Sequence, residues 1–358
     1  MQIKVNTQEH TCSKKPSSEQ IRPSSVKWIA ATILPWVDEK PEVGVAELRG
    51  KIEKKFGVQF PYDRVFDGKE IALDMIQGNW NDSFTMLYSF KAEVEKTSPG
   101  SVVDIDYELV RGRPKISRGV KYVMADKKCF RRCFACLRAC WKGFLEGCRP
   151  YLAVDSTPLT GKFGGQLATA AAVDANNWTL PVAYGIIEEE SDESWTWFME
   201  RLRGVIGHPP GLVIHTNACK GLENVVDAVF TGVEDRECMR RLSVKFMKKF
   251  KGKIFENNLW PASFTYSPRR HATLVQNMYT QPKVKEYLEE HHTKLWARSK
   301  FGELSKVDFV SNSLLDTFFS QINDLKSRAM VLLLDELRQY IMLIIGKKIM
   351  QVDLLAIK

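Results

Sequence analysis

Two polar residues stand at the ends of short apolar runs in the middle of the chain. The run Tyr151–Asp155 closes with a carboxylate, and Asn217 directly follows the run Gly211–Thr216. Short apolar runs bounded by turn-forming residues are typical of buried β-strands. Carboxylates that converge at strand ends can hold two divalent ions for phosphoryl transfer. Asp155 fits that chemistry, whereas the neutral amide of Asn217 does not.

The elements between these two residues must position them. Two further strands are predicted at Gln166–Val173 and Thr179–Ile187, and Ser194–Ile206 has the apolar spacing of a helix. Three strands joined by hairpins, then a helix, then another strand is the order of an RNase H-like sheet. We therefore predict an α/β fold with an RNase H-like core.

The same stretch carries short motifs that follow one another in a fixed order. They read VDSTPLTGKFGG, then VDANNWTLPVAYGIIEEESDESWTWF, then IHTNACKGL. This series resembles the core of the plant Mutator-like (MULE, MuDR-type) transposases. The resemblance implies a DDE transposase core with a helical insertion, preceded by a small helical domain. It also implies a nuclear protein that acts on terminal-inverted-repeat DNA, with Mg²⁺ or Mn²⁺ if it is active.

The resemblance places the family's third acid at Asp316, within SNSLLDTFF. The catalytic triad then reads Asp155, Asn217 and Asp316, with Asp155 and Asp316 as the expected metal ligands. An amide is a poorer Mg²⁺ ligand than a carboxylate. Asp316 replaces a glutamate, and a misplacement of about 1 Å can cost roughly 10²-fold in rate. The family's C-x-x-H motif reads CMRR here, so Arg241 stands where the family has histidine.

These departures predict a transposase-derived DNA-binding protein with impaired DNA cleavage and strand transfer. Two alternatives stay open. One is an active DDE transposase that uses Asp155, Asn217 and Asp316 with a divalent metal. The other is a non-enzymatic basic scaffold or regulator that forms a homo-oligomer through the helical insertion.

The charge of the chain suits a polyanionic partner. The 358 residues carry a formal net charge of +9, which fits DNA but also fits an ordinary basic protein. No apolar run reaches the roughly 18 residues of a membrane span, so no membrane contact is predicted. Two predicted helices carry candidate phosphate contacts, although a solvated basic face would read the same way. The candidates are Lys51, Lys54, Lys55, Arg240, Arg241, Lys245, Lys248, Lys249 and Lys251.

His10 and Cys12 form an H-x-C pair near the N-terminus. In the resembling family a similar pair supplies the last two ligands of a zinc-binding DNA-recognition domain. Tetrahedral zinc needs four ligands, and the other two would precede residue 1. Zinc is therefore expected only if those ligands exist, and residues 1–24 are predicted to be a disordered remnant.

Cysteines gather between residues 129 and 148. Cys129, Cys133, Cys136 and Cys140 fall at the spacing of one helix face. On one helix they would span about 16 Å at about 1.5 Å per residue, too far to share one ion. We therefore predict core thiols.

Two local predictions complete this reading. A first helix at residues 26–34 should stop at Pro35, and His291 and His292 are expected to be exposed.

The pattern as a whole predicts six segments. The segments are the remnant 1–24, a helix-turn-helix-like domain 25–100, a linker strand and Cys-rich helix 101–148, the RNase H-like core 149–252, the helical insertion 253–306, and the C-terminal helices 307–358 that carry the third acid.

Overall fold

The computed structural model of the chain describes residues 24–41, 43–57, 59–77, 80–110, 114–117, 120–123, 126–217 and 221–356. The half zinc site at His10 and Cys12 lies outside these residues. The chain divides into two compact units, residues 1–81 and 82–358. None of the described helices is both long enough and apolar enough to span a membrane.

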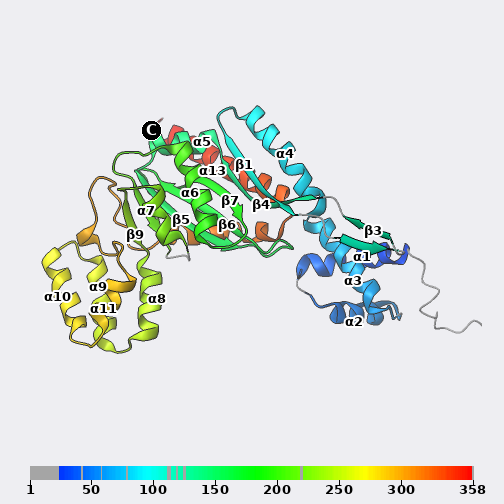
Figure 1. Cartoon of the computed structure of the whole chain (residues 1–358), viewed down its shortest axis with the longest axis horizontal. Coiled ribbons are helices and arrows are strands. Elements are labelled where there is room, and N and C mark those ends of the chain that lie inside the picture. The colour runs from blue at the N-terminus through cyan, green and yellow to red at the C-terminus, as the bar shows by residue number, and fades with distance from the viewer. Residues whose placement is uncertain are drawn as a thin grey trace, which may run out of the picture. The chain divides into compact units, whose positions relative to one another are not determined.

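The described part of the first unit is a small helical bundle (Figure 1). Its core side chains, among them Ile33 and Leu48, are fully buried. The prediction that the first helix stops at Pro35 is wrong, because Pro35 lies inside that helix. Val37, beyond the proline, is fully buried in the same core, and its burial offsets the lost backbone hydrogen bond. The helices are α1 (Ser24–Glu39), α2 (Val45–Phe56) and α3 (Tyr62–Gln77).

The second unit is built on a seven-stranded mixed sheet in the order β1-β4-β7-β6-β5-β8-β9. Strands β5, β6 and β7 form two successive antiparallel pairs, and β8 is parallel to both β5 and β9. The carboxyl ends of β5, β7, β8 and β9 therefore share one edge of the sheet. The strands are β1 (Val102–Val110), β4 (Lys127–Cys136), β5 (Tyr151–Pro158), β6 (Gln166–Val173), β7 (Thr179–Ile187), β8 (Val213–Thr216) and β9 (Glu234–Glu237). A separate hairpin joins β2 (Pro114–Ser117) to β3 (Val120–Val123).

Helices cover both faces of this sheet (Figure 1). Successive strand residues point to opposite faces, so Leu152 and Val154 pack on one helical layer and Tyr151 and Ala153 on the other. The α/β prediction is therefore confirmed at the level of layers. One layer is α5 (Arg138–Gly147), α6 (Asp192–Ile206) and α7 (Leu222–Val229); the other is α4 (Trp80–Thr97), α12 (Ser313–Gln321) and α13 (Met330–Ala356).

The cysteine-rich segment is not the predicted helix. Residues 127–136 form strand β4, and only Cys140 of the four spaced thiols lies in a helix, α5. Both faces of β4 are buried over residues 132–136, so apolar side chains point to both faces there and can mimic a helical period. Burial raises the pKa of Cys133 and of Cys140 to about 12. Cys133, Cys136 and Cys140 are buried core residues, as predicted, but Cys129 is exposed, so the prediction is wrong for that residue. The helical geometry on which the prediction rested is also wrong.

A group of helices after β9 packs around its own apolar core, which includes Phe246 and Leu259. Here the prediction of two exposed histidines is half wrong. His291 is exposed, but His292 is buried and its Nδ1 lies 2.8 Å from a carboxylate oxygen of Glu237. His291 is the last residue of its helix, so the backbone turns at His292 and carries that side chain inward. The helices are α8 (Met239–Lys249), α9 (Lys253–Phe264), α10 (Pro268–Tyr279) and α11 (Val284–His291), and 3₁₀ turns follow at η2 (Arg298–Lys300) and η3 (Asn323–Ser327).

Candidate functional site

Asp155 and Asn217 meet at the shared edge of the sheet. In the parallel β5–β8 pair Val154 lies opposite Thr216, so the next residue of each chain segment emerges on the same face. Asp155 is 2% exposed and Asn217 4%. The side-chain amide of Asn217 donates a hydrogen bond from Nδ2 to Oδ2 of Asp155. The predicted convergence of these two residues is thus present, with the amide as a direct partner of the carboxylate.

Asp316 lies in the first turn of α12, a helix that contacts β5. Its carboxylate accepts a hydrogen bond from Nη1 of Arg240, in the first turn of α8, at 2.9 Å. This ion pair is open to solvent, with 66% of the Arg240 side chain and 40% of the Asp316 side chain exposed. The third predicted acid is therefore held by a cation of the same chain.

Asn312 and Cys238 join the elements that carry these residues. The buried Asn312 side chain donates from Nδ2 to the carbonyl oxygens of Val154 at 3.3 Å and His215 at 3.4 Å. The backbone N–H of Asn312 donates to the Cys238 sulfur at 3.3 Å, and the Cys238 N–H donates to the Thr216 carbonyl at 3.0 Å. These bonds fix β5, β8, α8 and α12 around one point. Sequence reasoning placed Asn312 in the motif of Asp316 but did not predict that it joins these elements.

His215 is a buried residue of β8, two positions before Asn217. It is fully buried, and its Nδ1 lies 2.7 Å from the hydroxyl of Tyr151. Burial, with a smaller effect of the nearby Arg236 charge, lowers the pKa of His215 to about 3. The imidazole is neutral at physiological pH and supports the strands rather than titrating beside Asp155.

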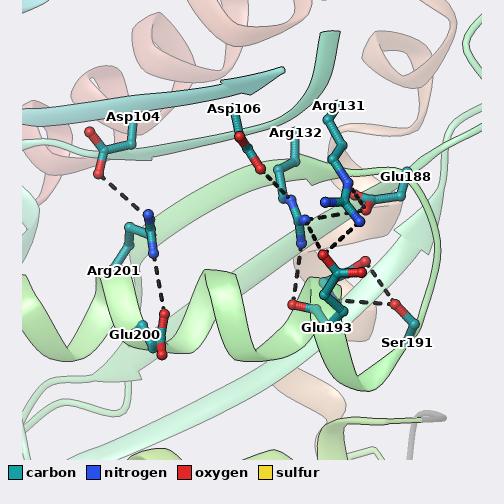
Figure 2. Close-up of polar contacts among 10 residues, drawn as sticks. Asp104, Asp106, Arg131, Arg132, Glu188, Ser191, Glu193, Glu200 and Arg201 are labelled. Carbon is teal, nitrogen blue, oxygen red and sulfur yellow. Dashed lines mark hydrogen bonds and ion pairs between the residues drawn. The ribbon is translucent and has the colours of Figure 1, made fainter. Parts of the chain in front are cut away.

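The acidic run between β7 and α6 could in principle replace a missing carboxylate, because it begins at the same sheet edge. Figure 2 shows that two of its acids are held by arginines of β4. Arg131 contacts Glu188 at 2.9 Å and Glu193 at 2.7 Å. The 2% exposed Arg132 contacts Glu193 at 2.9 Å and Asp106 of β1 at 3.0 Å. Hydrogen bonds from Arg131 and then Arg132 lower the pKa of Glu193, so these acids tie α6 to the sheet.

A third acid of the run, Glu190, is also engaged. The hydroxyl of Ser156 donates to a carboxylate oxygen of Glu190 at 2.6 Å. Ser156 follows Asp155 on β5 and therefore points to the opposite face of the sheet. Glu190 thus lies on the face away from Asp155 and does not complete the set of acids there.

Residues 151–245 match the family model of the MULE transposase domain. The chain therefore carries a MULE transposase domain. The match begins at the first residue of β5 and ends within α8, so it includes Asp155 and Asn217. The Mutator-like part of the resemblance is confirmed, while the plant MuDR subtype stays a prediction. Among curated proteins no match to the chain is found.

A two-metal centre of the kind the resemblance implies would draw on Asp155, Asn217 and Asp316. Such a centre needs carboxylates that bridge two ions about 3.5–4 Å apart. At Asp155 the neighbouring group is the side chain of Asn217, whose amide oxygen is a neutral and poorer Mg²⁺ ligand than a carboxylate. Asp316 already has Arg240 as its counter-charge. Across the described residues, no group of three or more His, Cys, Asp or Glu side chains is placed to hold a metal ion.

Helix α8 closes the MULE domain with a basic surface. Its apolar face, which includes Leu242 and Phe246, is buried, and its five Lys and Arg residues are exposed with no acid among them. These are Arg240, Arg241, Lys245, Lys248 and Lys249, and the exposed Lys251 follows.

The cations predicted on α2, in the first unit, have neighbours of another kind. Lys51 pairs with Glu47 at 3.0 Å. The ammonium groups of Lys51 and Lys55 lie 5.9 and 5.6 Å from the centre of the Trp36 ring. Lys54 is exposed. Lys249 of α8 likewise lies 4.5 Å from the centre of the Tyr287 ring, so partners of this kind do not exclude either helix from phosphate contacts, and the cations of α2 stay candidates.

Proposed function

We propose that this chain is a Mutator-like transposase-derived DNA-binding protein of the nucleus whose DNA cleavage and strand transfer are impaired. The single observation that carries the proposal is the hydrogen bond from Asn217 to Asp155 inside the MULE domain. It supports a site in which the first acid is satisfied by a neutral amide rather than by a shared metal ion.

The site has one carboxylate fewer than two-metal chemistry needs. Two-metal phosphoryl transfer depends on carboxylates that bridge both ions and so offset their mutual repulsion. An amide brings no negative charge, and Mg²⁺ prefers carboxylate and water oxygens. Asp155 and Asn217 are both nearly inaccessible to solvent. A metal at Oδ2 of Asp155 would therefore displace the Asn217 N–H, and the amide would have to rotate before its oxygen could coordinate the same ion.

We assign the second unit to the RNase H-like class as part of this proposal. Its support is the order of three antiparallel strands followed by the parallel strand β8, with helices on both faces. In this arrangement Asp155 and Asn217, at the family's first and second acid positions, stand at the ends of neighbouring strands, and Asp316 comes from a helix that contacts β5.

DNA binding is supported by the charge distribution. The chain has a net charge of +9, and α8 concentrates five exposed cations beside the acidic site. Cations on one helix face bind phosphates without reading sequence, and their contribution falls with rising salt. The terminal inverted repeats of a Mutator-like element are the expected DNA.

The test is nicking and joining of terminal-inverted-repeat DNA in Mg²⁺ or Mn²⁺. We expect no metal-dependent product from the unmodified chain. The triple variant Asn217→Asp, Asp316→Glu, Arg241→His restores the acids and the histidine of the family pattern and is expected to gain weak nicking. Cleavage by the unmodified chain, abolished by Asp155→Ala, would establish the active alternative instead.

A further inference from the structure

The acidic site contains a cation of its own. We propose that Arg240 takes the place of the divalent metal at Asp316 and offers its remaining N–H groups to a DNA phosphodiester, so that the site binds DNA without metal. The proposal rests on the proposed DNA-binding function. It adds where the DNA backbone docks and which group competes with a metal there.

The geometry of the ion pair leaves Arg240 able to bind a second anion. The guanidinium carries five N–H donors, and one of its nitrogens, Nη1, contacts Asp316 at 2.9 Å. No other partner of this guanidinium is found within the described ranges, and 66% of the side chain is exposed. Arginine binds carboxylate and phosphate through separate edges of the same planar group. The exposed edge of Arg240 is therefore available to a phosphate oxygen.

The site continues into a track of cations along α8. From Arg241 to Lys248 the helix rises by about 10 Å at about 1.5 Å per residue, roughly three phosphates of one DNA strand at about 3.4 Å each. The exposed side chains of this track lie opposite the buried Leu242 and Phe246. A DNA strand on α8 would thus bring one end of its contact to Arg240 and Asp316.

Arg240 and a metal would compete for the same carboxylate. A divalent ion can bind Asp316 only if the guanidinium of Arg240 moves away. The positive charge of Arg240 then still repels the ion from nearby. The buried junction of Asn312 and Cys238 holds α8 and α12 together, so the two charged side chains stay neighbours. Removal of the Arg240 charge should therefore favour metal binding while it weakens DNA binding in the absence of metal.

The experiment compares Arg240→Gln with Arg241→Gln in the full chain. The two positions are adjacent, both are exposed, and each variant loses one positive charge, but only Arg240 contacts Asp316. Mn²⁺ is titrated into each protein without DNA by calorimetry. Binding of a duplex is measured in EDTA at several salt concentrations by fluorescence anisotropy.

We expect Arg240→Gln to raise Mn²⁺ affinity about three- to fivefold, the range of an exposed ion pair, and Arg241→Gln to leave it unchanged. In EDTA, Arg240→Gln should weaken duplex binding and lower the salt slope by about one unit. Asp316→Asn should tighten duplex binding in the unmodified background and have a smaller effect when combined with Arg240→Gln, which a double-mutant cycle measures.

Three other outcomes would contradict the DNA-binding function, the docking site at Arg240 or the competition with a metal. If the unmodified chain binds no duplex in EDTA, both the docking site and the proposed function fail. If it binds and Arg240→Gln keeps the same salt slope, the docking site fails and the function stands. Equal Mn²⁺ affinity for Arg240→Gln and the unmodified chain would overturn the competition, whatever the DNA results.

Discussion

The two carboxylates of the acidic site, Asp155 and Asp316, have different kinds of hydrogen-bond partner. In the buried half, Asp155 is 2% exposed and its partner is the neutral amide of Asn217. In the exposed half, Asp316 is 40% exposed and its partner is the charged guanidinium of Arg240. Removal of a buried partner destabilises the fold strongly, because the remaining group has neither its hydrogen bond nor water in its place. An exposed ion pair is worth little and can exchange its partner.

The buried half of the site thus concerns metal binding, and the exposed half concerns DNA binding. The buried half decides whether a metal can be held, because a neutral amide there removes a bridging charge. The exposed half decides what approaches the site, because Arg240 can exchange Asp316 for a phosphate. Substitutions in the buried half should therefore change stability more than substitutions in the exposed half.

The largest expected effect follows from a second carboxylate in the buried half. Asn217→Asp places two acids together away from water, which should lower the free energy of unfolding by about 3 kcal/mol in EDTA at neutral pH. Chemical denaturation monitored by circular dichroism measures the loss. Mn²⁺ should recover part of it, because a bridging cation relieves the repulsion. The matched exposed change, Asp316→Glu, should leave stability within about 0.5 kcal/mol. Equal stability of Asn217→Asp and the parent in EDTA would contradict the buried half as described.

The junction that joins the two halves should come next in size. Asn312→Ala removes the donor to two buried carbonyls and should cost about 2 kcal/mol of stability. The control is Asn257→Ala on the exposed side of α9, expected within about 0.5 kcal/mol of the parent. A cost at position 312 no larger than at position 257 would show that the strands and α12 are held in another way.

Acid should act on the buried half through His215. Its folded pKa is about 3 and lies below the unfolded value, so the unfolded chain binds the proton more readily. Stability is therefore present above about pH 6.5 and falls as the pH drops toward 3, at up to about 1.4 kcal/mol per pH unit. His215→Phe should reduce this acid sensitivity relative to the parent, and the exposed His208→Phe should not. If the stability of all three proteins fell equally with pH, His215 would not be the cause of the acid sensitivity.

The smallest effect is expected in the exposed half. Asp316→Asn breaks the ion pair with Arg240 and should change the free energy of unfolding by less than about 1 kcal/mol. High salt should reduce the difference further, because exposed charges are screened. Thermal unfolding at low and high salt measures both. A loss above 2 kcal/mol, insensitive to salt, would show that Asp316 is structurally buried in solution.

Much of the sheet could be predicted from sequence. Gln166–Val173 and Thr179–Ile187 are strands with the predicted bounds, because continuous apolar runs between turn residues leave few alternatives. The meeting of Asp155 and Asn217 followed from strand ends that share an edge. Strand β4 could not be found in this way, because burial on both faces removed the alternation that marks a strand.

The pairing within the site was not readable from sequence. The resemblance directed attention to Arg241, whereas the residue that reaches Asp316 is its neighbour Arg240. On a helix, one position corresponds to a rotation of about 100°, so only the packing of α8 decides which arginine faces α12. The same applies to His292, which is buried against Glu237 while His291 is exposed.

The most direct measurement is a calorimetric titration of the unmodified chain with Mn²⁺, beside Asn217→Asp and Asp155→Ala. We expect the unmodified chain and Asp155→Ala to bind Mn²⁺ only weakly, with affinities below the micromolar range, and Asn217→Asp to show a new, tighter binding event. Micromolar binding of two Mn²⁺ ions by the unmodified chain, lost in Asp155→Ala, would contradict the account. It would mean that Asn217 serves as a ligand and that the acids form a working metal centre.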